Sequence, residues 1–189
     1  METNLEIEYK TILTKEEYLM LRKERFRGDI IKQVNTYFDN VNHDLLRARI
    51  MMRIRRIEET MDEFTIKVEA QKNVMEYSFT QEKIEITHPN ITDFLSKHGF
   101  HGPFHKIAAS TTYRIIDRDD FGEWALDRSF HGHTEDFELE YEVFEDSVET
   151  KERYLNLLKT YNITYKKSLP KFIRSIKAHQ DELDQLLEE

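Results

Sequence analysis

Charged and apolar side chains alternate near the start of the sequence. Glu6, Glu8 and Lys10 are separated by Ile7 and Tyr9. A β-strand sends successive side chains to opposite faces, so the three charges would share one face and the two apolar residues the other. A face with this composition is either exposed to water or part of a charged site.

The same alternation recurs in later stretches, where the charges are sorted by sign. Arg53 and Arg55 lie in one stretch, whereas Glu138, Glu140 and Glu142 lie in another. If the apolar faces formed the inside of a sandwich, the charged faces would be exterior and of mixed sign. The sorting favours an inverted barrel, with apolar faces covered outside by helices and charged faces lining a central cavity. A cavity lined by both signs suits a polyanion and its metal.

The basic residues have the types and spacing of an anion site. Arg53 and Arg55 would share one face, and an arginine fork matches phosphate oxygens bidentately. Lys67, Arg114 and Lys10 would add charges from three other strands. The alternative is that these bases pair with carboxylates as structural salt bridges. Burying so many ions for structure alone is unfavourable, because desolvation often exceeds the Coulombic gain.

The acidic residues have the spacing of a site for a divalent cation. Two carboxylates two residues apart on one strand can share a hard cation, which prefers oxygen ligands. Glu6 with Glu8 and Glu138 with Glu140 have this spacing, and Asp127 adds a third acidic strand. The alternative is a strand face exposed to water. One alternating charged stretch by itself would indicate such a face about as strongly as a metal site.

Composition limits the classes of function. The chain has 189 residues, enough to bury a sizeable core, and we treat 1–189 as one domain. A formal net charge of -9 argues against a broad nucleic-acid interface. Without cysteine, disulfides, cysteine-ligated zinc and a thiol nucleophile are excluded. No signal sequence and no run of about 18 apolar residues is present, so we expect a cytoplasmic protein that binds neither membrane nor nucleic acid.

Alternation, caps and turn residues predict an α+β protein. Thr14, with Glu17 three residues later, forms a capping box that begins the first helix. Helices are expected at 14–26, 90–98, 147–161 and 170–187, with a short helical turn at 43–48. Eight strands are expected at 3–12, 30–39, 50–58, 62–70, 74–86, 105–118, 122–129 and 136–145.

Other reactive side chains are interpreted as structural or exposed. Tyr37-Phe38-Asp39 is expected to be strand packing followed by a turn carboxylate. The glycines never form the Gly-x-x-x-x-Gly-Lys loop, which excludes nucleotide binding through a P-loop. Five of the eight histidines lie near glycine-containing turns without companion zinc ligands, so we expect exposed loop residues at His98, His101, His105, His131 and His133.

In their order along the chain, these residues resemble the CYTH superfamily, also called triphosphate tunnel metalloenzymes, and in particular its small bacterial members of the YjbK type. The resemblance implies an eight-stranded antiparallel β-barrel, a tunnel with a charged lumen, flanked by helices. It also implies binding of a linear triphosphate with Mg²⁺ or Mn²⁺. The matching series is Glu6-x-Glu8-x-Lys10, Tyr37-Phe38-Asp39, Arg53-x-Arg55, Thr65-Ile66-Lys67, Arg114, Leu126-Asp127, Glu138-x-Glu140 and Lys171.

The resemblance also implies roles for individual residues. A further family carboxylate maps by spacing to Glu76, with Glu82 as the alternative, and the last lysine maps to Lys171, with Lys166 and Lys167 as alternatives. The implied metal ligands are Glu6, Glu8, Glu76, Asp127, Glu138 and Glu140. The implied phosphate-binding residues are Lys10, Arg53, Arg55, Lys67, Arg114 and Lys171.

The resulting hypothesis is a metal-dependent triphosphatase without a protein nucleophile, with Glu138, Glu140 and Lys10 as its catalytic residues. Its substrate would be a small molecule: inorganic tripolyphosphate, thiamine triphosphate or a nucleoside triphosphate. Two alternatives stay open. One is a module that binds polyphosphate or a nucleotide without turnover, and the other is a class IV-like adenylyl cyclase. The substrate and the oligomeric state are not determined by these residues.

Overall fold

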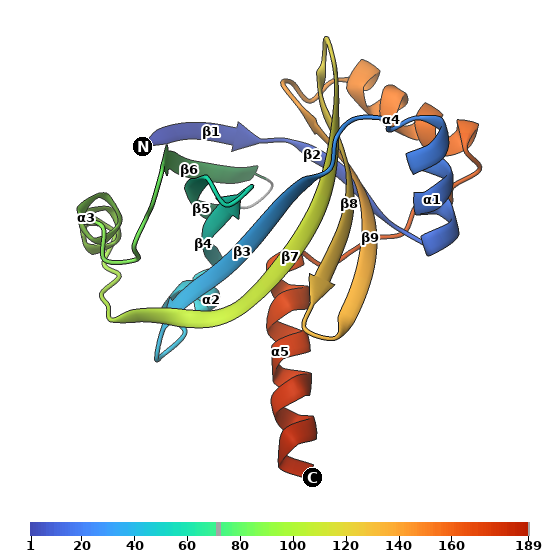
Figure 1. The fold of residues 1–189 in the computed structure, drawn as a ribbon. Helices are drawn as coiled ribbons and strands as arrows, with labels where there is room; N and C mark the ends of the chain where they lie inside the picture. The colour runs from blue at the N-terminus through green and yellow to red at the C-terminus, as the bar shows by residue number, and fades with distance from the viewer. Residues whose placement is uncertain (71–72, 189) are drawn as a thin grey trace.

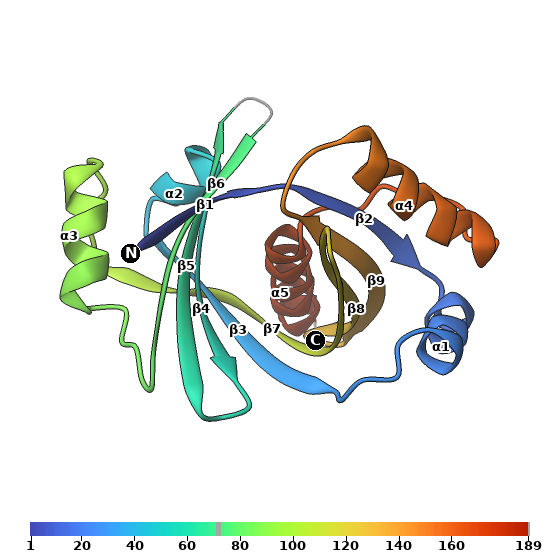
Figure 2. The ribbon, with the colours of Figure 1, turned by 90° about the horizontal axis from the view of Figure 1, so that it is seen from above.

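The structure, a computed structural model, describes residues 1–70 and 73–188. Within these residues, nine strands form one antiparallel sheet that curls around a central axis, with the earlier helices outside it and the C-terminal helix running from one end of the curl (Figures 1 and 2). The strands are β1 (Glu2–Glu6), β2 (Glu8–Leu13), β3 (Ile31–Asn40), β4 (Ile50–Ile57), β5 (Met61–Ala70), β6 (Asn73–Gln81), β7 (Phe104–Asp119), β8 (Gly122–His131) and β9 (Thr134–Val143). The helices are α1 (Lys15–Glu24), α2 (Asp44–Arg47), α3 (Pro89–Lys97), α4 (Val148–Thr160) and α5 (Lys171–Glu188).

The N-terminal stretch joins the two edges of the curled sheet. The strand order is β1-β6-β5-β4-β3-β7-β8-β9-β2, so β1 and β2 lie at opposite edges although they are adjacent in the chain. Glu6 pairs with Val74 of β6, whereas Glu8 pairs with Glu142 of β9. The predicted strand 3–12 is therefore two strands that meet at Ile7. The described strands number nine rather than eight, because the stretch changes its hydrogen-bonding partner there.

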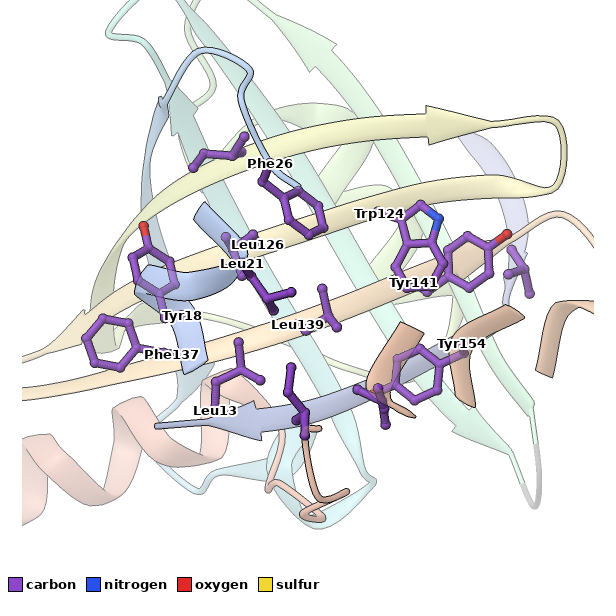
Figure 3. Packing of buried hydrophobic residues seen from close by; sticks show 14 residues of the cluster. Leu13, Tyr18, Leu21, Phe26, Trp124, Leu126, Phe137, Leu139, Tyr141 and Tyr154 are labelled. Carbon is purple, nitrogen blue, oxygen red and sulfur yellow. The ribbon is translucent and has the colours of Figure 1, made fainter. Parts of the chain in front are cut away.

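The apolar faces of the strands point outward and are covered by helices, as predicted from the sorted charges. Under α1 and α4, the rings of Trp124 and Tyr141 stack with centroids 3.7 Å apart, and Tyr154 of α4 packs beside them (Figure 3). A second cluster lies under α2 and α3, where Phe64 and Ile91 have no exposed surface. Full burial of side chains of this size contributes about 1.5–3 kcal/mol each.

The first helix begins with the predicted capping box. The Glu17 backbone N–H donates to Thr14 Oγ1 at 3.2 Å, and the Thr14 backbone N–H donates to Glu17 Oε2 at 2.7 Å. These bonds satisfy donors that a helix end otherwise leaves unpaired. Tyr18 and Leu21 lie on the buried face of this helix, so the cap sets how α1 covers the sheet.

Asp39 is a turn carboxylate, as predicted. Its oxygens accept hydrogen bonds from the backbone N–H groups of Leu45 at 3.1 Å and Leu46 at 2.9 Å, which hold the start of α2. Tyr37 is buried at the other end of this motif and packs against Phe172 of α5. The motif therefore supports the wall of the tunnel and the docking of α5.

One predicted boundary is wrong. The strand expected at 74–86 ends at Gln81, although Ile84 and Ile86 continue the alternation. The Ile84 backbone N–H donates to Asp62 Oδ2 at 2.8 Å, and its side chain joins the cluster under α3. These contacts of Ile84 outside the sheet therefore end the strand before this residue.

The prediction for His131 is also wrong. His131 is 1% exposed, with Nδ1 2.7 Å from Ser175 Oγ and Nε2 3.1 Å from Asp136 Oδ2. It is buried because α5 packs over the end of β8. The remaining predicted loop histidines are exposed: His98, His101, His105 and His133. Within the described part of the chain, no helix is long and apolar enough to cross a membrane.

Candidate active site

The strand register places one half of the predicted site on the inner face of the sheet. Directly paired residues of neighbouring strands share a face. Arg114 on β7 pairs with Asp127 on β8, and Asp127 pairs with Glu138 on β9. Glu140 pairs with Lys10 on β2. The alternate residues of these strands pack outside under α1 and α4, so these five charged side chains point into the tunnel.

The other half of the site lies on β4, β5 and β6. Arg53 and Arg55 alternate with residues that pack outside under α3, as does Lys67 on β5. Lys67 pairs with Glu76 on β6. Each predicted site residue thus belongs to the inner face or, for Lys171, reaches it from α5.

Arg114 and Lys171 hold the buried carboxylate of Asp127. Arg114 Nε lies 2.8 Å from Asp127 Oδ1, and Arg114 Nη2 lies 2.6 Å from Oδ2. Lys171 Nζ lies 2.5 Å from the same Oδ2. Both cations also contact Glu140. Since Asp127 has no exposed surface, this is a desolvated ion network rather than a surface salt bridge.

Arg53 and Arg55 share a carboxylate that sequence reasoning missed. Glu63 Oε1 lies 3.2 Å from Arg53 Nη2 and 3.6 Å from Arg55 Nη1. Burial and the neighbouring Arg53 lower the pKa of Arg55 to about 10, while Glu63 opposes this shift. Glu63 has the same strand parity as Thr65 and Lys67, so the alternation of β5 could have identified it as an inner-face residue.

Lys67 of β5 and Glu6 of the edge strand β1 meet at the inner face, across β6. Lys67 Nζ contacts Glu6 and lies 3.4 Å from Glu76 Oε2. Glu82, the alternative to Glu76, is exposed and lies beyond the end of β6. The structure therefore places Glu76, and not Glu82, beside the predicted phosphate-binding lysine.

Two neighbouring carboxyls on β9 have opposite pKa shifts. Burial raises the pKa of Glu138 to about 7, and the charge of Glu140 adds to this, against the effect of Lys171 and Arg174. Burial also acts on Glu140, but Lys171 and Arg114 outweigh it and hold the pKa of Glu140 well below its ordinary value. The strand thus presents one firmly ionised carboxylate beside one that gains a proton easily.

Lys10 and Glu8 form a pair on β2. Lys10 Nζ lies 2.5 Å from Glu8 Oε1. Burial disfavours the charged lysine, but Glu8 and Glu140 outweigh it and raise the pKa of Lys10. Burial and the charge of Glu140 raise the pKa of Glu8. Glu140 of β9 acts on both residues of β2, which is expected for side chains that share the inner face of the sheet.

The structure distinguishes the three candidate lysines near the C-terminal end. Lys166 Nζ pairs with Glu17 Oε2 at 3.2 Å, outside the sheet, and Lys167 is exposed. Lys171, at the start of α5, is the one that reaches the lumen. Figures 1 and 2 show α5 leaving one end of the curled sheet with this end nearest the strands.

Arg174, which sequence reasoning also missed, lies one helical turn after Lys171. Its Nε is 3.0 Å from Asp136 Oδ2, and its Nη1 is 2.5 Å from Glu138 Oε2. Residues three apart in a helix share a face, so the spacing from Lys171 could have identified it. α5 therefore brings two cations to the carboxylates of β8 and β9.

The carboxylates supply the oxygen ligands that a divalent cation prefers, but they are not arranged as a complete set of metal ligands. Within residues 1–70 and 73–188, no three Asp, Glu or His side chains converge closely enough to hold a metal ion. Neither buried oxygen of Glu138 has a hydrogen bond of acceptable geometry among these residues, although Arg174 approaches one as an ion pair. A buried carboxylate with unused lone pairs fits a hard divalent cation.

Comparison with known proteins gives one family. A family model described as the CYTH domain matches residues 4–176. YjbK of Bacillus subtilis (strain 168), which is provisionally named a triphosphatase, is 26% identical over 193 residues, covering 92% of this chain and 95% of that protein.

Solved structures share the fold. One from Bacillus halodurans, provisionally described as an adenylate cyclase, has a TM-score of 0.81 and 25% identity, covering 92% of this chain and 98% of that chain. One from Hippeastrum, provisionally described as an adenylyl cyclase that reveals a dominant triphosphatase activity, has a TM-score of 0.71, covering 90% of this chain and 94% of that chain. At 17% identity, the second likeness supports the curled-sheet fold alone.

Proposed function

Because the chain belongs to the CYTH domain family, we propose that it hydrolyses a linear triphosphate inside the tunnel. The observation that carries this proposal is a set of bases from four strands and one helix that lies on the inner side of the curled sheet together with paired carboxylates. The bases are Lys10, Arg53, Arg55, Lys67, Arg114 and Lys171. The substrate class comprises inorganic tripolyphosphate, thiamine triphosphate and nucleoside triphosphates.

The bases would bind and align the phosphate chain. Phosphoryl transfer to water needs little covalent help from a protein, but the chain has to be held in line and its developing charge neutralised. Arg53 and Arg55 would bind phosphate oxygens from β4, while Lys10, Arg114 and Lys171 would contact the chain from the opposite wall. Such alignment can lower a barrier by roughly 7–11 kcal/mol in well-oriented cases.

The carboxylates would hold the metal and orient the water. When bound, Mg²⁺ or Mn²⁺ would neutralise phosphate oxygens and lower the pKa of the attacking water. Mg²⁺ is usually bound by one or two carboxylates together with substrate phosphates, which agrees with acidic groups spread around a tunnel. Glu138 and Glu140 would orient the water, with Lys10 balancing their charge. The proposed ligands are Glu6, Glu8, Glu76, Asp127, Glu138 and Glu140.

A phosphate-release screen tests the proposal. Wild-type protein is given tripolyphosphate, thiamine triphosphate and ATP, each with Mg²⁺, Mn²⁺ or EDTA. Release of phosphate from at least one substrate, abolished by EDTA, is the expected result. No release from any of them with either metal would contradict it.

The same screen separates the two alternatives. An adenylyl cyclase would convert ATP to cyclic AMP and pyrophosphate, which chromatography distinguishes from ADP and phosphate. A binding module without turnover would give heat of binding by calorimetry but no product. Either outcome would replace the proposed hydrolysis.

A further inference from the structure

Glu63 is an acidic side chain placed on the pair of arginines proposed to bind phosphate. It lies on the inner face of β5, and its side chain is 25% exposed. Thr65 Oγ1 donates to Glu63 Oε1 at 3.3 Å, in addition to the two arginine contacts. The burial of the site disfavours its charge, but Arg53 and Arg55 outweigh this effect and lower the pKa of Glu63. Glu63 is therefore an anion held on an anion site.

The contacts of Glu63 with its arginines are longer than those of Asp127 with Arg114. Its oxygen lies 3.2 Å and 3.6 Å from the two guanidinium groups, whereas Arg114 holds Asp127 through two contacts of 2.8 Å and 2.6 Å. Charge-assisted contacts of well-paired groups are usually 2.7–2.9 Å long. The Glu63 carboxylate can thus be replaced on the arginines with less loss than Asp127 on Arg114.

The two arginines need an anion when no phosphate is bound. They lie two residues apart on one strand face, and burial together with the charge of Arg53 lowers the pKa of Arg55. Glu63 offsets this repulsion in the free protein. A phosphate that binds the same guanidinium groups brings a second negative charge next to Glu63, and like charges at such distances repel strongly in a partly buried site.

We propose that Glu63 is an internal counter-anion that occupies the Arg53–Arg55 pair in the free protein and competes with the phosphate chain for it. This inference rests on the proposed function of the tunnel. The competition lowers the affinity for metal-free triphosphate more than the affinity for its metal complex. The reason is that a divalent cation bound to the phosphates offsets their repulsion by Glu63. Glu63 is therefore a specificity-determining residue that favours the metal complex of the substrate over the free polyanion.

Two other roles for Glu63 give effects that differ from those of a counter-anion. If Glu63 only held the arginines in position, neutralising it would loosen them and weaken anion binding. If it were a metal ligand, neutralising it would raise the metal concentration needed for turnover. A counter-anion gives tighter binding of the metal-free ligand when its charge is removed, with no rise in the metal concentration needed for turnover.

Calorimetric titration with tripolyphosphate in EDTA tests the inference. Glu63→Gln keeps the shape and the contact with Thr65 but removes the charge, so its Kd is expected to fall roughly tenfold below that of wild type. The matched control is Glu85→Gln, which removes an exposed carboxylate paired with Lys83 at 2.8 Å on the outside, and its Kd should equal that of wild type. With Mg²⁺, the KM of Glu63→Gln should fall by less, about twofold to threefold.

A Kd for Glu63→Gln in EDTA that equals or exceeds that of wild type overturns the inference. If this variant does not fold, Glu63→Asp, whose carboxylate is withdrawn from the arginines by one methylene group, must show the same direction of change. Failure of the proposed function is seen separately, as the absence of phosphate release by wild type with metal. In that case the Kd values of wild type and Glu63→Gln in EDTA still test the role of Glu63, because binding of an anion to the arginines does not require turnover.

Discussion

Arg114 and Asp127 lie directly opposite each other on β7 and β8 and form a two-point ion pair inside the tunnel, with contacts of 2.8 Å and 2.6 Å. Asp127→Asn leaves two buried cations, Arg114 and Lys171, without this partner. We expect the free energy of unfolding to fall by about 3 kcal/mol, because breaking a buried pair leaves an uncompensated charge. Urea unfolding followed by circular dichroism measures this loss.

The control for Asp127→Asn lies on the same two strands. Arg118 pairs with Glu123 at 2.8 Å, but its side chain is 74% exposed. Arg118→Ala should change the free energy of unfolding by less than about 1 kcal/mol. Equal losses for the two variants would show that the network around Asp127 is not desolvated as described.

Lys171 and Lys166 provide a second matched pair. Both are near the C-terminal end, but Lys171 reaches Asp127 in the tunnel whereas Lys166 pairs with Glu17 outside. Under the proposed function, Lys171→Met should lower kcat/KM for the triphosphate by roughly 100-fold, the usual scale for loss of one charge-stabilising donor. Lys166→Met should leave kcat/KM within about twofold of wild type. Phosphate-release kinetics of both variants test this. A larger loss for Lys166→Met than for Lys171→Met would contradict the assignment of Lys171 to the site.

The raised pKa of Glu138 predicts a pH dependence of stability in EDTA. Its folded pKa is about 7, above the ordinary value of 4.5, so the folded protein binds this proton more tightly. The resulting stabilisation is fully present below the ordinary pKa of 4.5 and is lost as pH rises through the folded pKa of about 7. Between pH 8 and pH 6, Glu138 should add about 1 kcal/mol to the free energy of unfolding.

Glu138→Gln isolates this contribution from those of other titrating groups. The gain in stability from pH 8 to pH 6 should be smaller in the variant than in wild type by that amount. Thermal unfolding at both pH values measures the difference. Parallel curves for the two proteins would mean that Glu138 does not carry a raised pKa.

Local alternation predicted most of the fold and the inner face because it records which side of each strand is buried under helices. The residues at 6, 8 and 10, at 53 and 55, and at 138 and 140 all follow this rule. The break at Ile7 and the end of β6 at Gln81 did not follow from it. Both depend on partners distant in the sequence, β9 in the first case and Asp62 with the outer cluster in the second.

The remaining differences concern contacts made by α5 and pairs made across strands. His131 is flanked by a turn, so only the packing of Ser175 from α5 explains its burial. Arg174 could be found from its spacing to Lys171, but its pairing with Glu138 depends on how the helix docks. Glu63 could be placed inside by parity alone, whereas its position on two arginines depends on the register between β4 and β5.

Turnover by an Arg55 variant tests the central claim most directly, because Arg55 is an inner-face base and Arg118 is an exposed arginine of the same protein. Phosphate release is measured for wild type, Arg55→Ala and Arg118→Ala with the preferred triphosphate and metal. A tunnel that aligns the phosphate chain predicts a loss of at least roughly 100-fold for Arg55→Ala and an unchanged rate for Arg118→Ala. A folded Arg55→Ala protein with the wild-type rate would contradict triphosphate hydrolysis inside this tunnel.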